Sequence, residues 1–380
     1  MDKARTKYSF ERIAINSTEK KKPSEEDRLT YIGLEHLDSG SLTVTRFGSE
    51  VAPIGEKLVM RKGDVLFGKR RAYQKKVAIA PFDGIFSAHG MVLRPNEEVV
   101  DRKFFPMFIS SDYFLDAAID ISVGSLSPTI NWRDLKNLEF NLPPLEEQRK
   151  LAKVLWAIND AMEAYKRLIS ATDELVSSQF VEMFGDPISN PKQWEKESFA
   201  DCCEIITGNT PPRAHKEYYG HAIEWIKSDN ICNNNVYLTQ AAECLSDDGM
   251  LVGRTVDSGS ILMTCIAGSL RSIGNVAIVN RKVAFNQQIN AFIPKKFETW
   301  FLYYLLKLVR PIFHNATNQA LKCILTKGNI LEISVIVPPM ELQERFAAFA
   351  EQSDKSKFAI QQSLDKLETL KKALMQEYFG

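Results

Sequence analysis

The chain has 380 residues, of which 44% are hydrophobic and 25% are charged, as expected of an ordinary globular protein long enough for two domains. Lysine plus arginine and aspartate plus glutamate both number 48, so the formal net charge is zero, which disfavours a nonspecific polyanion binder but permits a local basic face. The sequence shows no signal-peptide pattern and no apolar stretch long enough to span a bilayer, so we expect a soluble, cytoplasmic protein.

Cysteine and histidine spacing disfavours the common zinc and disulfide frameworks. The six cysteines all lie at or after Cys202, and no pair has the C-x-x-C spacing. His215 and His221 lie near cysteines and could in principle hold zinc, but their spacing matches no zinc motif. We therefore expect no metal site in this chain and a reducing compartment.

Residues 1–141 have the pattern of a mixed α+β domain. Short aliphatic and β-branched runs, such as 62–67 and 77–80, are bounded by glycine, asparagine or proline and predict strands. The aromatic-rich run 104–119 predicts a helix.

The segment between those two strands is the most basic run of the chain. Its lysines and arginines can neutralise phosphates, and arginine and glutamine can also contact base edges; a solvated loop is the alternative. A G-x-x-x-x-G-K pattern begins at Gly63, but Arg70 stands where a phosphate-binding loop needs Ser or Thr, so no nucleotide site is expected. The DNA-contact candidates of this half are Lys69, Arg70, Arg71, Tyr73, Gln74, Lys75, Lys76, His89 and Asn131.

Residues 142–187 predict one long helix. The double proline at 143–144 suits a first helical turn, and the Glu and Gln that follow suit a helix N-terminus. Apolar residues then recur at 4-3 spacing from Leu151 to Met183, which is the seam of a helix that packs along another long helix. The sequence Gly185-Asp186-Pro187 ends the helix.

The same element recurs at 337–380, at a constant offset and without a gap (337 − 142 = 380 − 185 = 195). Its seam is most apolar at Leu364, Leu367 and Leu374. Such a repeat predicts that the two helices pack against each other within one chain. A dimerisation coiled coil is the alternative.

Residues 188–336 repeat the pattern of the first domain. Residues 225–232 correspond to 31–38, and residues 285–288 correspond to 86–89. The predicted fold is α+β, with two pseudo-symmetric α+β domains, each followed by one long helix. The predicted boundaries are 1–141, 142–187, 188–336 and 337–380.

The second domain differs from the first in the chemistry of its candidate contacts. It carries an amide-rich stretch near position 288, and amides suit adenine recognition in the major groove. The alternative is a segment that satisfies its own backbone. The loop 207–213 and a weakly charged loop at 267–275 are further candidates. The DNA-contact candidates of this half are Asn209, Arg213, Arg271, Asn286, Gln287, Gln288 and Asn290.

The chain resembles the specificity subunit of a type I restriction–modification system over nearly its full length. Four segments carry the resemblance: the two P-P-L-x-E-Q-like motifs at Pro143–Gln148 and Pro338–Gln343, the helix exit Met183–Pro187, and the strand-turn Lys62–Leu66. The chain departs from the family pattern in entering its first domain without a preceding helical segment and in ending at Gly380.

The resemblance implies a non-catalytic subunit that reads double-stranded DNA. The two pseudo-symmetric target-recognition domains would be separated by the two long antiparallel coiled-coil helices. Each recognition domain would read half of a split target, and the helix pair would fix the number of unread base pairs between the halves. Two methyltransferase subunits and two restriction subunits are the implied partners. They would use S-adenosylmethionine, ATP and Mg, with no cofactor in this chain. The expected methyltransferase contacts are three apolar positions off the helix seam: Trp156, Leu168 and Phe180.

Two other functions stay open at this point. One is a coiled-coil protein-interaction adaptor without DNA specificity. The other is the recognition part of a different multisubunit restriction–methylation enzyme. A methyltransferase active site in this chain is not expected, because no double proline has an acidic or amide residue before it and an aromatic residue after it.

Overall fold

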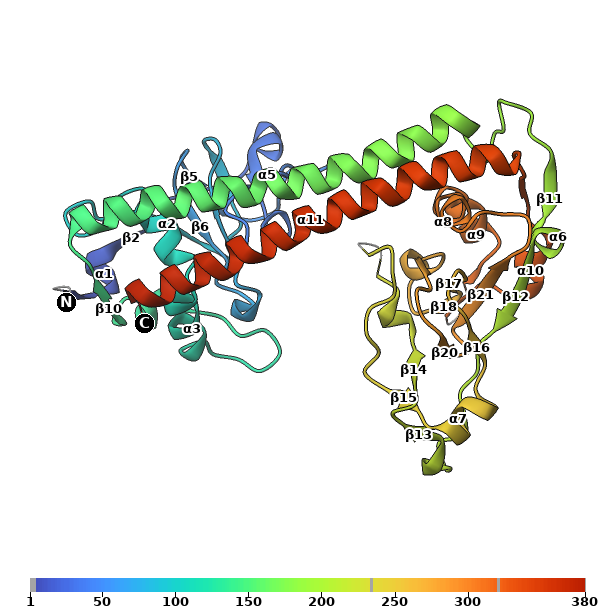
Figure 1. The fold of residues 1–380 in the computed structure, drawn as a ribbon. Coiled ribbons are helices and arrows are strands. Elements are labelled where there is room, and N and C mark those ends of the chain that lie inside the picture. The colour runs from blue at the N-terminus through green and yellow to red at the C-terminus, as the bar shows by residue number, and fades with distance from the viewer. Residues whose placement is uncertain (1–4, 233–234, 320–321, 380) are drawn as a thin grey trace. The chain divides into compact units, whose positions relative to one another are not determined.

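The computed structural model describes residues 5–232, 235–319 and 322–379. The chain divides into two compact units, one comprising 1–165 with 363–380 and the other comprising 166–362. Each unit combines a mixed α+β body with one half of each of two long helices (Figure 1). These helices are α5 (Leu145–Phe184) and α11 (Met340–Phe379).

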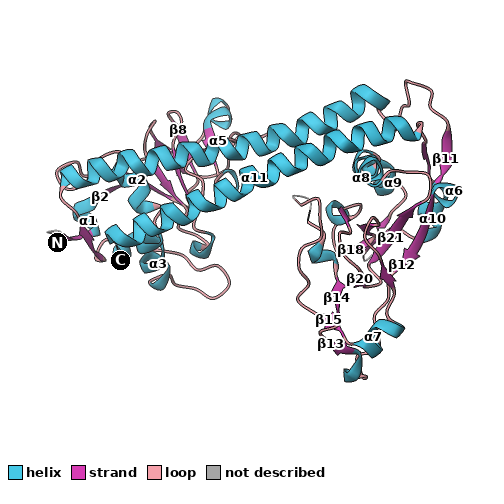
Figure 2. Ribbon diagram, viewed as in Figure 1, coloured by secondary structure: helices cyan, strands magenta, loops and turns pink. Residues whose placement is uncertain are grey.

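The body of the first unit is built on two four-stranded sheets (Figure 2). The first sheet has the order β2 (Ala14–Ser17), β9 (Met91–Pro95), β6 (Val65–Phe67) and β7 (Val77–Ile79), all antiparallel. The second has the order β3 (Lys20–Lys21), β5 (Lys57–Met60), β8 (Gly84–Phe86) and β4 (Tyr31–Ile32), of which β4 and β8 are parallel. The pair β1 (Thr6–Ser9) and β10 (Glu139–Leu142) joins the two ends of this body.

The second unit repeats the strand order of the first sheet and the parallel pair of the second. Its first sheet has the order β12 (Cys203–Thr207), β21 (Ile289–Pro294), β17 (Ile261–Thr264) and β19 (Val276–Ile278). Its second sheet has the order β13 (Tyr219–Gly220), β15 (Cys244–Leu245), β14 (Ile223–Ile226), β20 (Val283–Phe285) and β16 (Thr255–Val256), with β14 and β20 parallel. The end-joining pair is β11 (Lys196–Ser198) with β24 (Ser334–Ile336). A small sheet of β18 (Ile266–Ala267), β23 (Cys323–Ile324) and β22 (Asn318–Gln319) is added.

Helices complete each body. The first unit contains α1 (Phe10–Ile13), α2 (Phe104–Ile109), α3 (Asp112–Asp120), α4 (Trp132–Leu135) and the 3₁₀ turns η1 (Glu26–Thr30), η2 (Leu34–His36) and η3 (Ala72–Gln74). The second contains α6 (Phe199–Cys202), α7 (Asp247–Val252), α8 (Thr299–Leu308), α9 (Arg310–Asn315), α10 (Lys327–Glu332) and the 3₁₀ turns η4 (Lys216–Tyr218), η5 (Ser228–Asn230) and η6 (Leu270–Ser272).

The central sheet of each unit is buried on both faces. In the first unit, Phe67 and Leu93 pack into the core that also holds the helices, whereas Leu66 and Val92 pack into a second core. Because successive side chains of a strand point to opposite faces, this two-sided burial explains why these strands read as continuous apolar runs.

The helix expected over residues 104–119 is two helices. Ser111 stands between α2 and α3, and its hydroxyl accepts a hydrogen bond from Phe114 N at 3.2 Å, which caps α3. In the second unit the corresponding break lies at Val309, where α8 ends and α9 begins with a proline in its first turn. Apolar composition alone did not reveal these breaks.

The two long helices pair antiparallel within each unit. In the first unit Lys371 Nζ lies 3.3 Å from Asn159 Oδ1. In the second, Lys357 Nζ lies 2.7 Å from Asp173 Oδ1. Every residue of the two predicted seams is buried or half-buried, so the seams face their partners as predicted. Gly185 ends α5 in the left-handed conformation, with φ of 78°, as its position in the sequence predicted.

A buried glutamine fastens the start of each long helix to its body. Gln148 is 1% exposed; its Nε2 donates to Val99 O (3.0 Å) and Pro143 O (2.9 Å), and its Oε1 accepts from Asp101 N (2.8 Å). Gln343, also 1% exposed, donates to Pro338 O (2.8 Å) and Lys296 O (3.3 Å) and accepts from Glu298 N (2.9 Å). The double-proline motif thus ends in a side chain that satisfies three backbone groups.

We predict that Gln148→Leu lowers the free energy of unfolding by about 2–4 kcal/mol, because it leaves two carbonyls and one N–H without partners. Gln343→Leu should cost a similar amount. Thermal and urea unfolding of the full chain would measure both. The matched control is Gln352→Leu on the exposed side of α11, which should change stability by less than about 0.5 kcal/mol. Equal effects of Gln148→Leu and Gln352→Leu would contradict this role.

Candidate nucleic-acid interface

The basic run of the first unit has a fixed shape. Arg71 and Lys75, at φ of 55° and 49°, flank the turn η3 in the left-handed conformation, which non-glycine residues adopt only when the surroundings impose it. Arg71 N donates to Pro128 O at 2.8 Å, and Ile130 N donates to Lys69 O at 2.9 Å. The run is therefore tied to residues 128–130 and is not a freely solvated loop.

Several of the predicted basic contacts are engaged inside the protein. Lys75 Nζ lies 2.7 Å from carboxylate oxygens of both Asp112 and Asp116. Burial lowers the pKa of Lys75, but the hydrogen bonds to these two carboxylates raise it above its usual value on balance. Lys76 Nζ donates to Leu34 O at 2.6 Å. Both lysines thus have a structural role that the sequence did not indicate.

The remaining positive charge gathers around His89. Arg70 Nη1 lies 3.4 Å from His89 Nε2, and Arg70 Nε donates to Ser127 Oγ at 3.1 Å. Burial, followed by the charges of Arg70, Lys69 and Lys57, lowers the pKa of His89. We call Lys20, Lys57, Lys69, Arg70 and His89 the basic cluster.

A hollow of about 150 Å³ lies beside the basic cluster, lined among others by Lys20, Lys69 and Asn131. Burial and the charge of Lys20 lower the pKa of Lys69. Burial is the larger cause of both pKa shifts, and the neighbouring positive charges add to it. Because those charges repel one another, an anion bound here would be stabilised. Sequence reasoning missed Lys20 and Lys57, although the run Lys20-Lys21-Lys22 was a visible signal.

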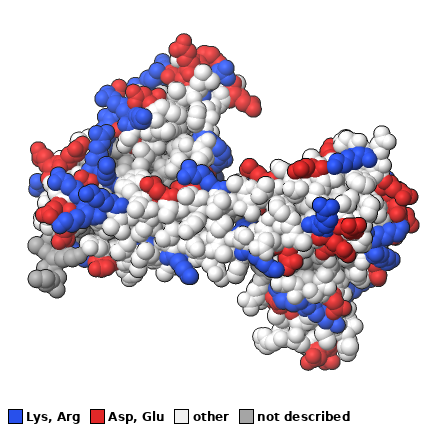
Figure 3. All heavy atoms as spheres, turned by 45° about the horizontal axis from the view of Figure 1, so that its top comes forward, with Lys and Arg blue, Asp and Glu red and all other residues white. Residues whose placement is uncertain are grey.

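Figure 3 shows Lys and Arg along the edge of the lobe at the left of the view, with Asp and Glu among them. Arg71, Tyr73 (57% exposed) and Gln74 lie in the same segment as Lys69 and Arg70 of the basic cluster.

We predict that Arg70→Ala raises the pKa of His89, because one of the positive charges that disfavour the imidazolium is removed. The rise should be partial, since burial is the larger cause. An NMR titration of the histidine ring would measure it. Arg71→Ala is the control: Arg71 is exposed and is not among the groups that shift His89. An unchanged His89 pKa in Arg70→Ala would contradict this view of the cluster.

Gln288 occupies in the second unit the place that His89 occupies in the first. His89 N donates to Ser87 Oγ at 3.3 Å, and Gln288 N donates to Asn286 Oδ1 at 3.0 Å. The carbonyl of His89 accepts from Arg70 N at 3.3 Å, and that of Gln288 accepts from Ile266 N at 3.1 Å. The two repeats therefore present different side chains on the same backbone frame.

Two predicted contacts of the second unit are used to hold its loops. Asn209 donates from Nδ2 to Val252 O (2.9 Å) and accepts at Oδ1 from Arg254 N (2.8 Å). Arg213 lies over the ring of Tyr219, 4.5 Å from its centroid, and donates to Glu243 at 2.9 Å. Both side chains thus bond to neighbouring segments of the second unit and help to hold its loops.

Burial corrects two further expectations. Asn290 is 2% exposed, and its Nδ2 donates to Cys265 Sγ at 3.2 Å. Asn286 is 6% exposed and bonds to Gln288. Neither side chain is available for direct contact with DNA in this structure, because the sheet and its turn cover them. Gln287 and Arg271 are exposed, and Gln288 is half-buried.

No cluster of three or more His, Cys, Asp or Glu that could hold a metal ion occurs in residues 5–232, 235–319 and 322–379. The same part of the chain contains no helix long and apolar enough to cross a membrane.

The family model of the type I restriction modification DNA specificity domain matches the chain twice, over residues 16–171 and 191–372. The chain belongs to this family. The two matches confirm the internal repeat and the two-domain α+β organisation.

Individual specificity subunits resemble the chain over most of its length. It is 22% identical to the type I restriction enzyme HindI specificity subunit of Haemophilus influenzae, over 75% of this chain and 79% of the relative. It is 22% identical to the putative type I restriction enzyme MjaX specificity subunit of Methanocaldococcus jannaschii, over 83% and 77%. The crystal structure of the type I restriction-modification system S subunit from M. genitalium covers 100% of this chain and 97% of its own, with a TM-score of 0.58 and 14% identity.

The three apolar positions predicted for partner contact lie in different surroundings in this specificity-domain protein. Leu168 is 48% exposed on α5. Trp156 is half-buried and donates from Nε1 to Lys103 O at 2.8 Å. Phe180 was wrongly expected to be exposed: it is fully buried against Phe184, Phe301 and Phe346. Sequence reasoning missed Val154 and Leu175, 48% and 54% exposed, which lie whole heptads from Leu168 on α5.

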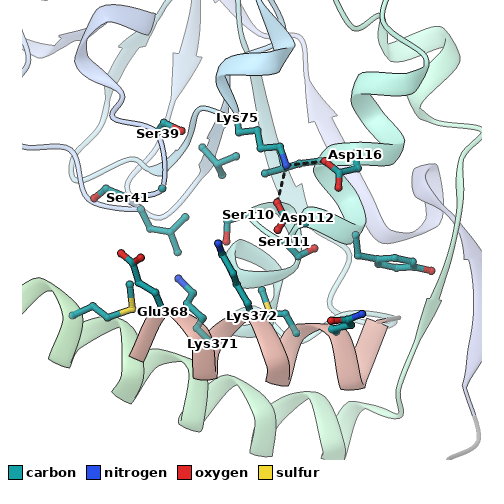
Figure 4. A pocket seen from close by; sticks show the side chains of 18 residues that line it. Ser39, Ser41, Lys75, Ser110, Ser111, Asp112, Asp116, Glu368, Lys371 and Lys372 are labelled. Atoms are coloured by element: carbon teal, nitrogen blue, oxygen red, sulfur yellow. Dashed lines mark hydrogen bonds and ion pairs between the residues drawn. The ribbon is translucent and has the colours of Figure 1, made fainter. Parts of the chain in front are cut away.

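The first unit also contains a cavity of about 740 Å³ between α3, α11 and the loop around Ser41. Figure 4 shows Lys371 and Lys372 reaching from α11 toward it, with Lys75 held between Asp112 and Asp116 on the opposite side. Its lining carries charges of both signs, unlike the basic cluster, so its electrostatics give no preference for a polyanion.

Proposed function

We propose that this chain is the DNA-specificity subunit of a type I restriction–modification complex and that its two units read the two halves of a split target. One structural observation supports this proposal in addition to the family membership. The equivalent positions His89 and Gln288 stand on matching backbone frames but in unlike surroundings, basic in one unit and rich in amides in the other. Such a pair suits the recognition of two different sequences.

The proposal includes the partners. Double-stranded DNA, two methyltransferase subunits and two restriction subunits would assemble with this chain, which itself would be non-catalytic. S-adenosylmethionine, ATP and Mg would be bound by those partners. The exposed residues Val154, Leu168 and Leu175 are our candidates for methyltransferase contact, because isolated apolar side chains at heptad spacing suit a second helix. A coiled-coil adaptor without DNA specificity is disfavoured by the family match.

The decisive experiment is co-expression with the cognate adenine methyltransferase subunit, followed by genome-wide mapping of methylated adenines. We expect one consensus made of two short half-sites with an unread spacer. Methylated adenines that share no consensus of two separated half-sites would contradict the proposal. The control is the methyltransferase subunit expressed alone, which should leave no such pattern.

A second prediction concerns phosphate contacts. Lys69→Ala should weaken binding of the methyltransferase complex to all DNA sequences alike and reduce the slope of log affinity against log salt by about 0.9, if Lys69 neutralises one phosphate. Fluorescence anisotropy over a salt series would measure both. Lys282→Ala, at an exposed lysine of the second unit near Asp257, is the control and should leave the slope unchanged. A change of base preference in Lys69→Ala would contradict a purely phosphate-binding role.

A further inference from the structure

The orientation of Gln288 restricts what its amide can recognise. Its Oε1 accepts hydrogen bonds from Asn286 Nδ2 at 3.2 Å and from Ser228 Oγ at 3.4 Å. Its Nε2 has no acceptor among the residues that the structure describes, and the side chain is half-buried. The amide oxygen is thus turned inward and occupied, and the two N–H groups are left to an outside partner.

The backbone of Gln288 is held as firmly as its side chain. Its carbonyl accepts from Cys265 N at 2.8 Å and from Ile266 N at 3.1 Å, and its N–H donates to Asn286 Oδ1 at 3.0 Å. Asn286 therefore bonds both to the main chain and to the amide oxygen of Gln288. Rotation of the Asn286 amide by half a turn would break both of these hydrogen bonds.

Close packing in turn fixes the segment that carries Asn286. Gly208 lies so near that an added Cβ would be 2.2 Å from Asn286 O. Asn209 N donates to Phe285 O at 3.1 Å, and Asn286 N donates to Ile226 O at 3.0 Å. The reading group is thus preorganised by strand ends and turns before any ligand is present.

We infer that Gln288 is a specificity-determining residue of the second half-site, that it presents hydrogen-bond donors only, and that it selects guanine. Asn286 is its positioning residue. An amide that pairs with adenine must offer an acceptor to N6–H and a donor to N7, whereas guanine offers two acceptors, N7 and O6. Because Oε1 already accepts hydrogen bonds within the protein, Gln288 offers no acceptor to adenine N6–H. The recognition of adenine that the amide composition alone suggests is therefore excluded. This inference rests on the proposed DNA-reading function.

The first repeat supplies the contrast that supports the role of Asn286. There Ser87 bonds to the main chain of His89 at 3.3 Å, as Asn286 bonds to that of Gln288. The second contact of Asn286, from its Nδ2 to the amide oxygen of Gln288, is the added element in the second repeat. The frame therefore tolerates serine at this position, and asparagine adds control over the amide orientation.

The test is Gln288→Glu in the complex with the methyltransferase subunit, with methylated sites mapped and binding measured to duplexes carrying each base pair at every half-site position. We expect one position of one half-site to change from guanine to cytosine, whose N4 group donates to a carboxylate. The relative preference should change by at least about tenfold, and the other half-site should stay unchanged. A complex that methylates the wild-type site with an unaltered base preference would overturn the inference.

Two further variants keep the test decisive. Gln287→Glu places the same charge one residue away, where the wild-type Oε1 accepts from Thr210; it should weaken binding to all sequences without changing the base. If Gln287→Glu instead changes the preferred base at a half-site position, Gln288 is not the residue that recognises that base. If Gln288→Glu abolishes binding, Gln288→Ala should still relax the preference at one position, and an unrelaxed preference would reject the assignment.

The positioning role of Asn286 is tested with Asn286→Ser, which copies the first repeat. The main-chain contact is retained, so binding to the remaining positions should be unchanged. The guanine preference should fall severalfold, because the Gln288 amide is free to turn. A uniform loss of affinity at every position would show that Asn286 is merely structural. Failure of the wild-type complex to methylate any split site would reject the proposed function and is distinguishable from all these outcomes.

Discussion

The buried glutamine at the start of each long helix is the constraint on which each unit depends. Gln148 and Gln343 are 1% exposed and join their helices to two backbone carbonyls and one N–H apiece. A glutamine amide has one acceptor and two donor groups, and here each is paired. Because an unpaired buried group costs free energy, the helix can begin in only one position relative to its own α+β body.

On this fixed frame the two units carry different chemistry. The first sheets of the two units have the same strand order, and each second sheet contains one parallel pair. After β8 and after β20, the backbone N–H of His89 and that of Gln288 each donate to a side-chain oxygen two residues earlier. The first unit places His89 beside Arg70 and Lys69, and burial together with these charges lowers the pKa of His89. The second places Gln288 among amides and a serine hydroxyl. The two units thus differ in the side chain at this position, whose backbone N–H and carbonyl already have hydrogen-bond partners.

Much of the architecture was predictable because its signals are periodic. The repeat offset, the 4-3 seams and Gly185 gave both long helices and their pairing within one chain, and the family resemblance implied their antiparallel direction. Aromatic composition failed at residues 104–119, because nothing in a run of buried residues marks where a helix stops; Ser111 decides that by capping α3. Phe180 was misplaced for a related reason. It lies off the seam, yet it is buried by Phe301, which comes from another element.

The sequence by itself determined the duplication, the fold class and the family, since these depend on order, spacing and hydrophobic period. Tertiary structure alone decided which polar residues are free to bind. Lys75 and Lys76 are engaged by Asp112 and Leu34 O, whereas Arg70 and Lys69 remain in a field of like charge. Gln288 has its amide oxygen occupied. Hydrogen bonds and charge pairs form between residues distant in the chain, so local sequence cannot specify them.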